Sequence, residues 1–429
     1  MAELAINGGK KVRDRLFPAY RVIGEEEKRA VEKVLDSGIL SKYLGCWAED
    51  FYGGPQVRKL EEEWASYYGV KNAIAVNSAT SGIYCAVGAA GVSMGDEVIV
   101  SPYTMCASAT APIIYNATPV FADIEYEYYC LDPDDVERKI TSKTKAIIVV
   151  DILGQPYDIE RINEIAQKHN LIVIEDNAQG PYAKYGDKFA GTLGDIGIFS
   201  LNYHKHIHCG EGGIVVTDND ELAERVRLIR NHAEAVVEKH GITNFNNMFG
   251  FNLRMTEVEA AIASEQLKKL KWLVEERRRN VEYIEKGISD LSFLRMPKVR
   301  ENCTHSYYLH ALKYDENMTG VSRDRFVEAL QAELMPIELR EAEGVKITKG
   351  YLAPLYMQPL FMNKMAYGES KFPFNDDISY DVGICPTCEK ICKEETIFHE
   401  LMRPFMSKSD LDDVIEAFHK VADNMDELI

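Results

Sequence analysis

The stretch TKAIIVVDILGQPYDIERINEIAQKHNLIVIEDNA, residues 144–178, contains the alternation that decides the fold class. Two apolar, β-branched runs at 144–153 and 171–178 flank a helix pattern at 158–170. Both runs are continuously apolar, which is typical of strands that helices cover on both faces. Further runs of this kind, bounded by turn residues, lie at 71–77, 95–102 and 118–124. We therefore predict an α/β domain with a mostly parallel sheet.

The length of the chain favours two domains. At 429 residues it exceeds the size at which one core keeps growing. We place a large domain at residues 1–275, with the N-terminal segment included, and a smaller α+β domain at 276–429. A long charged helix pattern at 256–290 is expected to cross from the first domain to the second.

Composition and charge exclude some function classes. The net charge of −19 argues against a general binder of nucleic acid or anionic membranes, because both need a basic surface. The sequence has no apolar run of the roughly 20 residues that a membrane helix needs. Its first residues, MAELAINGGKKVRDRLF, lack the long apolar core of a signal peptide. Nine cysteines without framework spacing indicate reduced thiols. We expect a cytoplasmic protein without a membrane or nucleic-acid partner.

Two segments follow predicted strands with residues that suit a ligand site. Glu175 and Asp176 end a buried-looking strand, where open α/β sheets bind their ligands. A carboxylate there could bind a metal, act as a base or pair with a cationic cofactor nitrogen, or it could cap the next helix. In VNSATSG, residues 76–82, a strand leads into a helix whose free N–H groups suit a phosphate. An ordinary turn capped by Ser78 or Thr80 explains that segment equally well.

The stretch FSLNYHKHIHCGEGG, residues 199–213, offers two kinds of chemistry. On a strand, His204, His206 and His208 would share one face and Lys205 would lie on the other. Three imidazoles could bind a transition metal. Because no HExxH motif accompanies them, polar lining is the more frequent role of such histidines.

Three cysteines in CPTCEKIC raise the same question of a metal site. Cys385, Cys388 and Cys392 form a lone CxxC with one further thiol. A structural zinc needs a second pair of ligands. The segment instead predicts a helix that begins near Pro386, and we predict no metal site.

Taken together, these features match the needs of one cofactor. A phosphate cradle, an acid at a strand end and a lysine before a glycine turn are the parts that pyridoxal phosphate (PLP) requires. The sequence also resembles the DegT/DnrJ/EryC1/StrS sugar aminotransferases over nearly its whole length. The resemblance rests on LAINGGKKVR, VNSATSG, GDEVIVSPYT, ATPVFADI, TKAIIVVDILGQP, VIEDNAQ, GTLGDIGIFS, CGEGGIVVTD and FNLRMTEVEAAI, in that order. It implies the PLP-dependent transferase fold of type I, with a smaller α+β C-terminal domain.

The resemblance also implies roles for individual residues. Lys205 matches the Schiff-base lysine and catalytic base, and Asp176 the partner of the pyridine nitrogen. Gln179 matches a glutamine near the cofactor's 3-hydroxyl. The family's phosphate cradle corresponds to Ser200 and to the backbone at Ala79 and Thr80. Asn252 matches an asparagine that reaches the phosphate in the neighbouring subunit, which implies a homodimer with shared active sites.

The implied reaction moves an amino group from glutamate or glutamine to a nucleotide-linked keto-sugar or a keto-cyclitol, in a ping-pong sequence. Two other interpretations stay open. One branch of the family has a histidine in place of the lysine and dehydrates keto-sugars, but the spacing from FS and from CGEGG favours Lys205 over His204 and His206. The second alternative is a PLP-binding protein with a regulatory role.

Several positions depart from the family pattern. Met105 stands where an aromatic residue usually stacks on the cofactor, and its thioether can pack on the ring instead. Ala79 replaces a glycine, and Asp151 stands where a histidine is common. Residues 45–61 form a longer entry segment, either a substrate-facing loop or a surface insertion. Arg254 and Arg403 are candidates for binding the donor's carboxylate.

Overall fold

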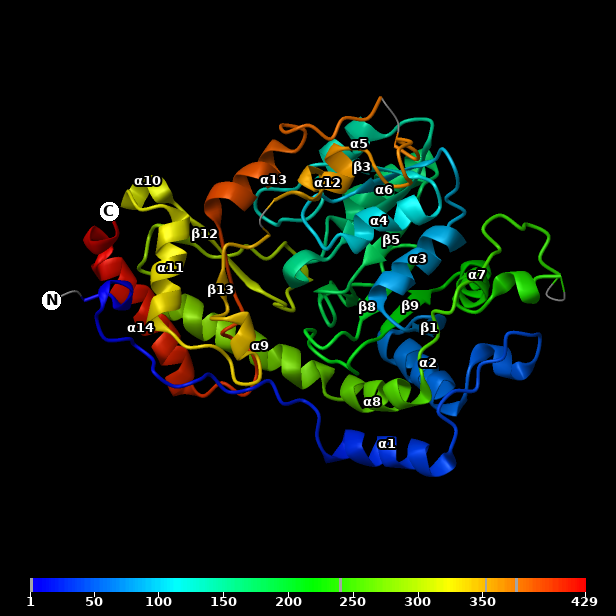
Figure 1. The fold of residues 1–429 in the computed structure, drawn as a ribbon, viewed down its shortest axis with the longest axis horizontal. Helices are drawn as coiled ribbons and strands as arrows, with labels where there is room; N and C mark the ends of the chain where they lie inside the picture. Colours follow the sequence, from blue (N-terminus) through cyan, green and yellow to red (C-terminus); the bar gives the residue numbers. More distant parts are fainter. Residues whose placement is uncertain (1–2, 239–240, 352, 375–376) are drawn as a thin grey trace.

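The computed structural model describes residues 3–238, 241–351, 353–374 and 377–429 (Figure 1). Its centre is a seven-stranded sheet in the order β1-β9-β8-β5-β4-β2-β3. The neighbouring pairs from β3 to β8 are parallel, and β9 is antiparallel to both β8 and β1. The predicted α/β fold with a mostly parallel sheet is therefore confirmed. The strands are β1 (Asn72–Val76), β2 (Glu97–Val100), β3 (Thr118–Phe121), β4 (Thr144–Val150), β5 (Ile172–Asp176), β8 (Ile196–Ser200) and β9 (Gly213–Thr217).

Helices cover both faces of this sheet, as the continuously apolar strands predict. Along β1, Ile74 and Val76 belong to one apolar core, whereas Ala73 and Ala75 belong to another on the opposite face. The helices around the sheet are α1 (Glu25–Ser37), α2 (Pro55–Tyr68), α3 (Ala79–Ala89), α4 (Ala107–Ile114), α5 (Pro133–Lys139), α6 (Ile159–His169), α7 (Asp220–Arg230) and α8 (Glu257–Leu267). Helix α3 packs on β5, β8 and β9, while α2 packs on β1 and α8.

The charged pattern at 256–290 forms two helices rather than one. Helix α8 ends at Leu267, and α9 (Leu270–Gly287) begins after a short break. As expected, α9 crosses between parts of the molecule (Figure 1). Its Leu273 and Val274 lie in the core shared with α2, and Val281 and Ile284 lie in a second core.

The second core surrounds a small antiparallel sheet. Its strand order is β10-β12-β14-β13. These strands are β10 (Leu294–Arg295), β12 (His310–Tyr314), β13 (Ile347–Thr348) and β14 (Thr396–His399), and the helices in this part are α10 (Glu316–Thr319), α11 (Arg323–Glu333) and α14 (Lys408–Asp423). A third, three-stranded sheet joins β6 (Lys184–Tyr185), β7 (Lys188–Phe189) and β11 (Cys303–Thr304).

From the sequence we expected the N-terminal segment to belong to the large domain. In the structure it packs in the second core. Leu4 and Phe17 are fully buried among residues of α9, α11 and α14. The backbone N–H of Ala5 donates to Glu333 Oε1 at 2.7 Å. Apolar contacts in the second core, hydrogen bonds to Glu333 and the ion pairs of Arg13 with Asp410 and Asp413 hold this segment. Both termini lie on the same side of the molecule (Figure 1).

Described residues at 354–374 and 377–392, which follow the second core in sequence, pack against the large sheet again. Tyr356, Phe361 and Tyr380 belong to the main core, and Tyr380 Oη donates to the Pro119 carbonyl at 2.7 Å. This segment contains α12 (Pro359–Met362) and α13 (Pro386–Lys390), which begins at the predicted proline. We keep residue 275, inside α9, as the proposed boundary, and assign this returning segment to the large domain.

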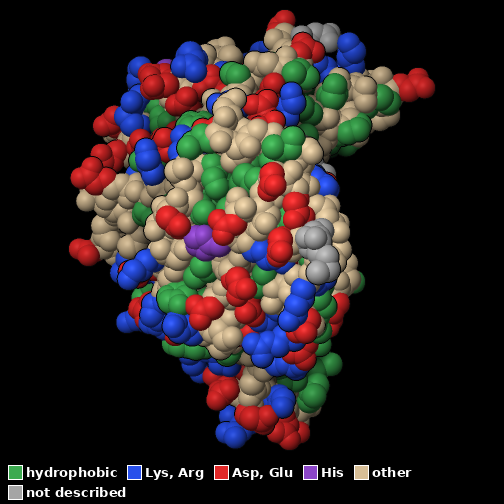
Figure 2. Space-filling model, turned by 90° about the vertical axis from the view of Figure 1, so that its left-hand side faces the viewer, with side chains coloured by type: hydrophobic (Ala, Val, Ile, Leu, Met, Phe, Trp, Pro, Cys, Tyr) green, Lys and Arg blue, Asp and Glu red, His purple; other side chains and the backbone are tan. Residues whose placement is uncertain are grey.

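The surface is mixed in charge. On the side shown in Figure 2, acidic and basic side chains lie interspersed. In the described part of the chain, no helix is both long and apolar enough to cross a bilayer.

Candidate active site

A cavity of about 330 Å³ opens where three strands of the large sheet end. Val150, Asp176 and Ser200 close β4, β5 and β8, and all three line the cavity. The carboxyl ends of parallel strands are where such sheets bind ligands. The cavity brings together all but one of the predicted site residues: Ala79, Thr80, Met105, Asp176, Gln179, Ser200 and Lys205. Other lining residues are Ser78, Thr104, Asn202, His204, Glu211, Tyr308 and Tyr351.

The segment after β1 presents free backbone donors to the cavity. Ser78 is the N-cap of α3, and its Oγ accepts from the Ser81 N–H at 3.1 Å. Ala79 and Thr80 occupy the first turn, where N–H groups have no acceptor within the helix. Ala79 is not among the residues with positive φ, so it replaces glycine here without strain.

Gly213 allows β9 to approach this turn closely. It pairs with Val76 in the β1–β9 ladder. A Cβ on Gly213 would lie 2.6 Å from Ala79 N and 2.7 Å from the Ser78 carbonyl oxygen. Any side chain at this position would therefore displace the backbone that carries the free N–H groups.

Asp176 is a buried carboxylate that lines the cavity. Its Oδ2 accepts from Ser108 Oγ at 2.9 Å, and its Oδ1 accepts from the Ala178 N–H at 3.2 Å. Burial raises the pKa of Asp176, while these hydrogen bonds and the charge of Lys205 act in the opposite direction. The carboxylate is thus oriented and lacks a cation bonded directly to it among the described residues.

Lys205 lies in a turn after β8 and not on a strand. Its Nζ lies 4.3 Å from the centroid of the Tyr308 ring. Burial lowers the pKa of Lys205 to about 8, although the charge of Asp176 acts to raise it. About a tenth of this amine is therefore neutral, and nucleophilic, at pH 7, far more than for an ordinary lysine.

A glutamine and a tyrosine line the neighbouring wall. The Leu153 N–H donates to Gln179 Oε1 at 2.8 Å, which fixes the amide and directs Nε2 to Tyr351 Oη at 3.3 Å. Met105, which also lines the cavity, is 60% exposed. Tyr308 and Tyr351 were not predicted, because they come from the C-terminal part of the chain and no local motif marks them.

Glu175, the acid before Asp176, is bound by backbone N–H groups of the protein. Its carboxylate accepts from the N–H groups of Gly191 (2.7 Å), Leu193 (2.7 Å) and Gly194 (2.9 Å). Asp151 is buried beside it, and burial together with the charge of Glu175 raises the pKa of Asp151. Asp151 is therefore the protonated member of the pair, and Glu175 carries the charge.

The three histidines do not converge. His206 is buried with Nε2 at 2.9 Å from the Ser306 carbonyl oxygen, whereas His204 Nδ1 lies 3.2 Å from an Arg340 nitrogen. The backbone N–H of His208 donates to Gln266 Oε1 at 3.4 Å, and its ring Nδ1 is buried without a hydrogen bond among the described residues. Within the described ranges, no group of three or more His, Cys, Asp and Glu side chains could hold a metal ion. Cys388 and Cys392 are buried with their sulfurs 4.0 Å apart.

Asn252 and the two candidate arginines lie outside the cavity lining. Asn252 is exposed, and its Oδ1 accepts from Arg254 Nε at 2.7 Å. Arg403 is buried and ion-paired with Glu400. Residues 45–61 also contribute no described residue to this lining; within them Phe51 is fully buried, so the segment packs on the protein itself.

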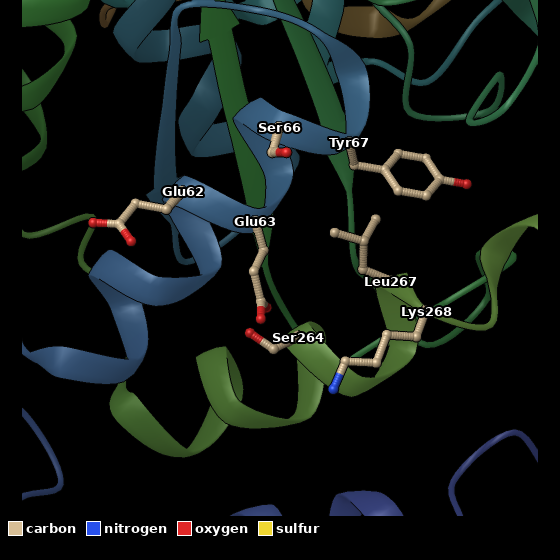
Figure 3. Close-up of a pocket in the computed structure, with 7 residues that line it drawn as sticks. All are labelled: Glu62, Glu63, Ser66, Tyr67, Ser264, Leu267 and Lys268. Atoms are coloured by element: carbon tan, nitrogen blue, oxygen red, sulfur yellow. The ribbon is translucent and has the colours of Figure 1, made fainter.

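A second hollow, of about 420 Å³, lies between α2 and α8 (Figure 3). Glu63 from α2 and Ser264 from α8 face one another across it. Lys268, the basic side chain drawn there, is ion-paired with Glu265 at 2.6 Å. We place the chemistry in the first cavity, which combines a partly neutral lysine, a buried acid and free backbone donors.

Comparison with known proteins identifies the family. The model of the DegT/DnrJ/EryC1/StrS aminotransferase family matches residues 21–401. The chain belongs to this family. It is 31% identical to the spore coat polysaccharide biosynthesis protein SpsC of Bacillus subtilis, over 94% of this chain and 96% of that protein. It is 30% identical to the L-glutamine:2-deoxy-scyllo-inosose aminotransferase of Streptoalloteichus tenebrarius, over 99% of each chain. The solved structure of DesI in the presence of its TDP-sugar product superposes with a TM-score of 0.81 at 26% identity, over 99% of this chain and 98% of that one.

As a DegT/DnrJ/EryC1/StrS aminotransferase, the protein is a PLP-dependent enzyme with the type I fold. The cavity fits this cofactor on its own evidence. A phosphate suits the free N–H groups beside Gly213, a cationic ring nitrogen suits Asp176, and an aldehyde suits the partly neutral amine of Lys205.

Proposed function

We propose that the protein transfers an amino group from glutamine or glutamate to the ketone of a cyclitol or a nucleotide-linked sugar, with Lys205 as its catalytic residue. The observation that carries the proposal is the placement of Lys205 and Asp176 in one cavity with free N–H donors at its rim. Their charges interact, and burial lowers the pKa of Lys205 to about 8.

Each residue has a defined task in this reaction. PLP, when bound, supplies an aldehyde that takes up the amino group and a ring that accepts the electron pair left by the α-proton. Asp176 keeps a proton on the ring nitrogen through its negative charge. Lys205 Nζ would take the α-proton from the donor as a general base and then, as a general acid, return a proton to the carbon two atoms away, on the other side of the shared nitrogen.

The remaining predicted residues position the cofactor. Ser200 and the N–H groups of Ala79 and Thr80 would bind the phosphate, and Gln179 would lie beside the ring's hydroxyl. Met105 would pack on the exposed face of the ring. Asn252, which is exposed and outside its own cavity, would reach the site of a second subunit in a homodimer.

The relatives support two acceptor classes. The full-length match to a cyclitol aminotransferase supports a keto-cyclitol, and the likeness to DesI supports a nucleotide-linked keto-sugar. Because glutamine is the donor named for the cyclitol enzyme, glutamine is the first donor to test.

The dehydratase alternative needs a histidine where Lys205 lies. His206 is fixed to the Ser306 carbonyl, and His204 is held by Arg340. The amine of Lys205, in contrast, interacts electrostatically with Asp176. These contacts support the lysine as the reacting group.

An isotope experiment tests the proposal. The holoenzyme is incubated with α-¹⁵N-glutamine and either 2-deoxy-scyllo-inosose or a dTDP-linked 4-keto-sugar, and the products are analysed by mass spectrometry. We expect ¹⁵N in the amine product of one acceptor class. A product that has lost a hydroxyl group without gaining ¹⁵N would establish the dehydratase, and no reaction with any amino donor would favour the regulatory alternative.

A further inference from the structure

One side chain of the cavity has no task in the reaction described above. His204 lines the cavity directly before Lys205. Its ring lies against Tyr203, with centroids 3.7 Å apart. An imidazole offers a donor at one nitrogen and an acceptor at the other, so its use depends on the tautomer.

The contact with Arg340 decides that tautomer. The Nδ1 atom of His204 lies 3.2 Å from an Arg340 terminal nitrogen. A guanidinium group only donates, so Nδ1 must be the acceptor and the ring hydrogen must be on Nε2. Among the described residues, no hydrogen bond occupies this Nε2–H.

Arg340 is fixed in this position by two acids. Its Nε and one terminal nitrogen donate to the two oxygens of Glu343, at 2.8 and 2.6 Å. The other terminal nitrogen donates to Glu400 at 2.9 Å. A bidentate contact of this kind fixes the plane of the guanidinium group as well as its place. The side chain of Arg340 is only 11% exposed.

The same surroundings keep the imidazole uncharged. Burial and the charge of Arg340 lower the pKa of His204 to about 4, with Arg403 and Lys346 acting in the same direction and Glu343 against it. His204 is therefore a neutral donor over the working pH range of most enzymes. A neutral donor suits a hydroxyl or carbonyl oxygen, whereas a carboxylate is bound best by a cation.

We propose that His204 Nε2–H donates a hydrogen bond to an oxygen of the amino acceptor, a polyhydroxylated ketone, and that Arg340 is the positioning residue that sets the tautomer. This assignment rests on the proposed function, because it concerns the acceptor that reacts at Lys205. His204 is then a specificity residue for hydroxylated rings that lies directly before Lys205. Arg340, from the C-terminal part of the chain, sets the tautomer of its ring.

Two ring-matched ketones measure this recognition. The pyridoxamine form of the enzyme is mixed with 2-deoxy-scyllo-inosose or with cyclohexanone, and the ratio of their kcat/KM values is recorded. His204→Phe keeps a ring but removes the donor. We expect the kcat/KM for the inosose, divided by that for cyclohexanone, to fall about tenfold, mostly because KM for the inosose rises. His204→Gln places an amide N–H near the position of Nε2 and should restore most of the ratio.

The positioning role of Arg340 is tested by the tautomer of the His204 ring. Selective ¹⁵N-histidine labelling, with the signal assigned by its absence in His204→Gln, should show the Nε2–H tautomer in the wild type. Arg340→Met should mix the tautomers and lower the ratio of kcat/KM values. Lys346→Met is the matched control, since Lys346 pairs with Glu343 as Arg340 does, but no hydrogen bond joins it to His204 among the described residues.

Three results would overturn the assignment. They are an unchanged ratio in His204→Phe, an Nδ1–H tautomer in the wild type, and no discrimination by the wild type between the two ketones. Failure of the proposed function looks different, because glutamine would then cause no spectral change in the wild-type holoenzyme, whereas the tautomer would still be observed.

Discussion

Replacing Asp176 by asparagine separates the charge of this residue from its shape. In Asp176→Asn the new side chain keeps Oδ1 to accept from the Ala178 N–H, and its Nδ2 can donate to Ser108 Oγ, because a hydroxyl also accepts. The hydrogen bonds that orient the side chain are therefore preserved. We expect this variant to fold and to unfold at nearly the wild-type temperature.

The effect on catalysis should be large. An opposite charge within a few ångströms shifts a pKa by about 1–3 units, and one unit is a factor of ten in the protonated fraction. Losing the charge of Asp176 should therefore slow the half-reaction with glutamine about 10- to 1000-fold. The same loss should move the pKa of Lys205 below its value of about 8, because Asp176 acts to raise it.

Two assays test both effects. Stopped-flow absorbance gives the rate of the donor half-reaction, and the pH dependence of cofactor uptake by the apoprotein gives the pKa of Lys205. Ser108→Ala, which keeps the charge of Asp176, is the control. A donor rate within twofold of wild type, or an unshifted pKa of Lys205, would refute the reasoning.

Further predictions concern the backbone around the cavity. Gly213→Ala should weaken PLP affinity about 5- to 150-fold, because its Cβ would press on Ala79 N. Gly212→Ala is the control, because the three atoms nearest to its added Cβ belong to the side chains of Cys209, Met255 and Leu201 and not to the backbone of the cradle. Fluorescence titration compares the two variants, and equal affinities would contradict the proposed cradle. In Glu175→Gln the new side-chain NH2 group faces a buried backbone N–H that the carboxylate now accepts from, so one donor loses its acceptor. The free energy of unfolding, measured with denaturant, should fall by about 1–3 kcal/mol. Asp151→Asn should be close to neutral in the same experiment, because the protonated acid already donates to Glu175; a large loss would show that Asp151 is ionised.

Much of the fold and the centre of the site could be predicted from the sequence because the signals are local. The continuously apolar strands predicted the sheet, and Asp176 was singled out by its place at a strand end. Ser200 was implied only by the resemblance to the family. Lys205 was predicted from the motif around it. The strand geometry considered for the three histidines does not occur, because the chain turns after Ser200 and His206 points to Ser306.

What the sequence did not indicate depends on contacts between distant parts of the chain. Tyr351 reaches the cavity, and Arg340 reaches His204, from the C-terminal third of the chain. Arg340 lies more than 130 residues after Lys205. The burial of Leu4 and Phe17 against α11 and α14 depends on surfaces that form only in the folded molecule. Glu175 looked equivalent to Asp176 in sequence, and only the three N–H groups around it show that its carboxylate is already engaged.

The most direct test of the central claim is the visible absorption spectrum of the purified protein with PLP, before and after glutamine is added, beside Lys205→Ala. The account predicts that the wild type shows the band of a lysine-linked cofactor and that glutamine converts it to the amine form, while Lys205→Ala shows no lysine-linked band and supports no turnover. A wild-type band that glutamine leaves unchanged, or sustained transamination by Lys205→Ala, would contradict the assignment of Lys205 as the catalytic residue.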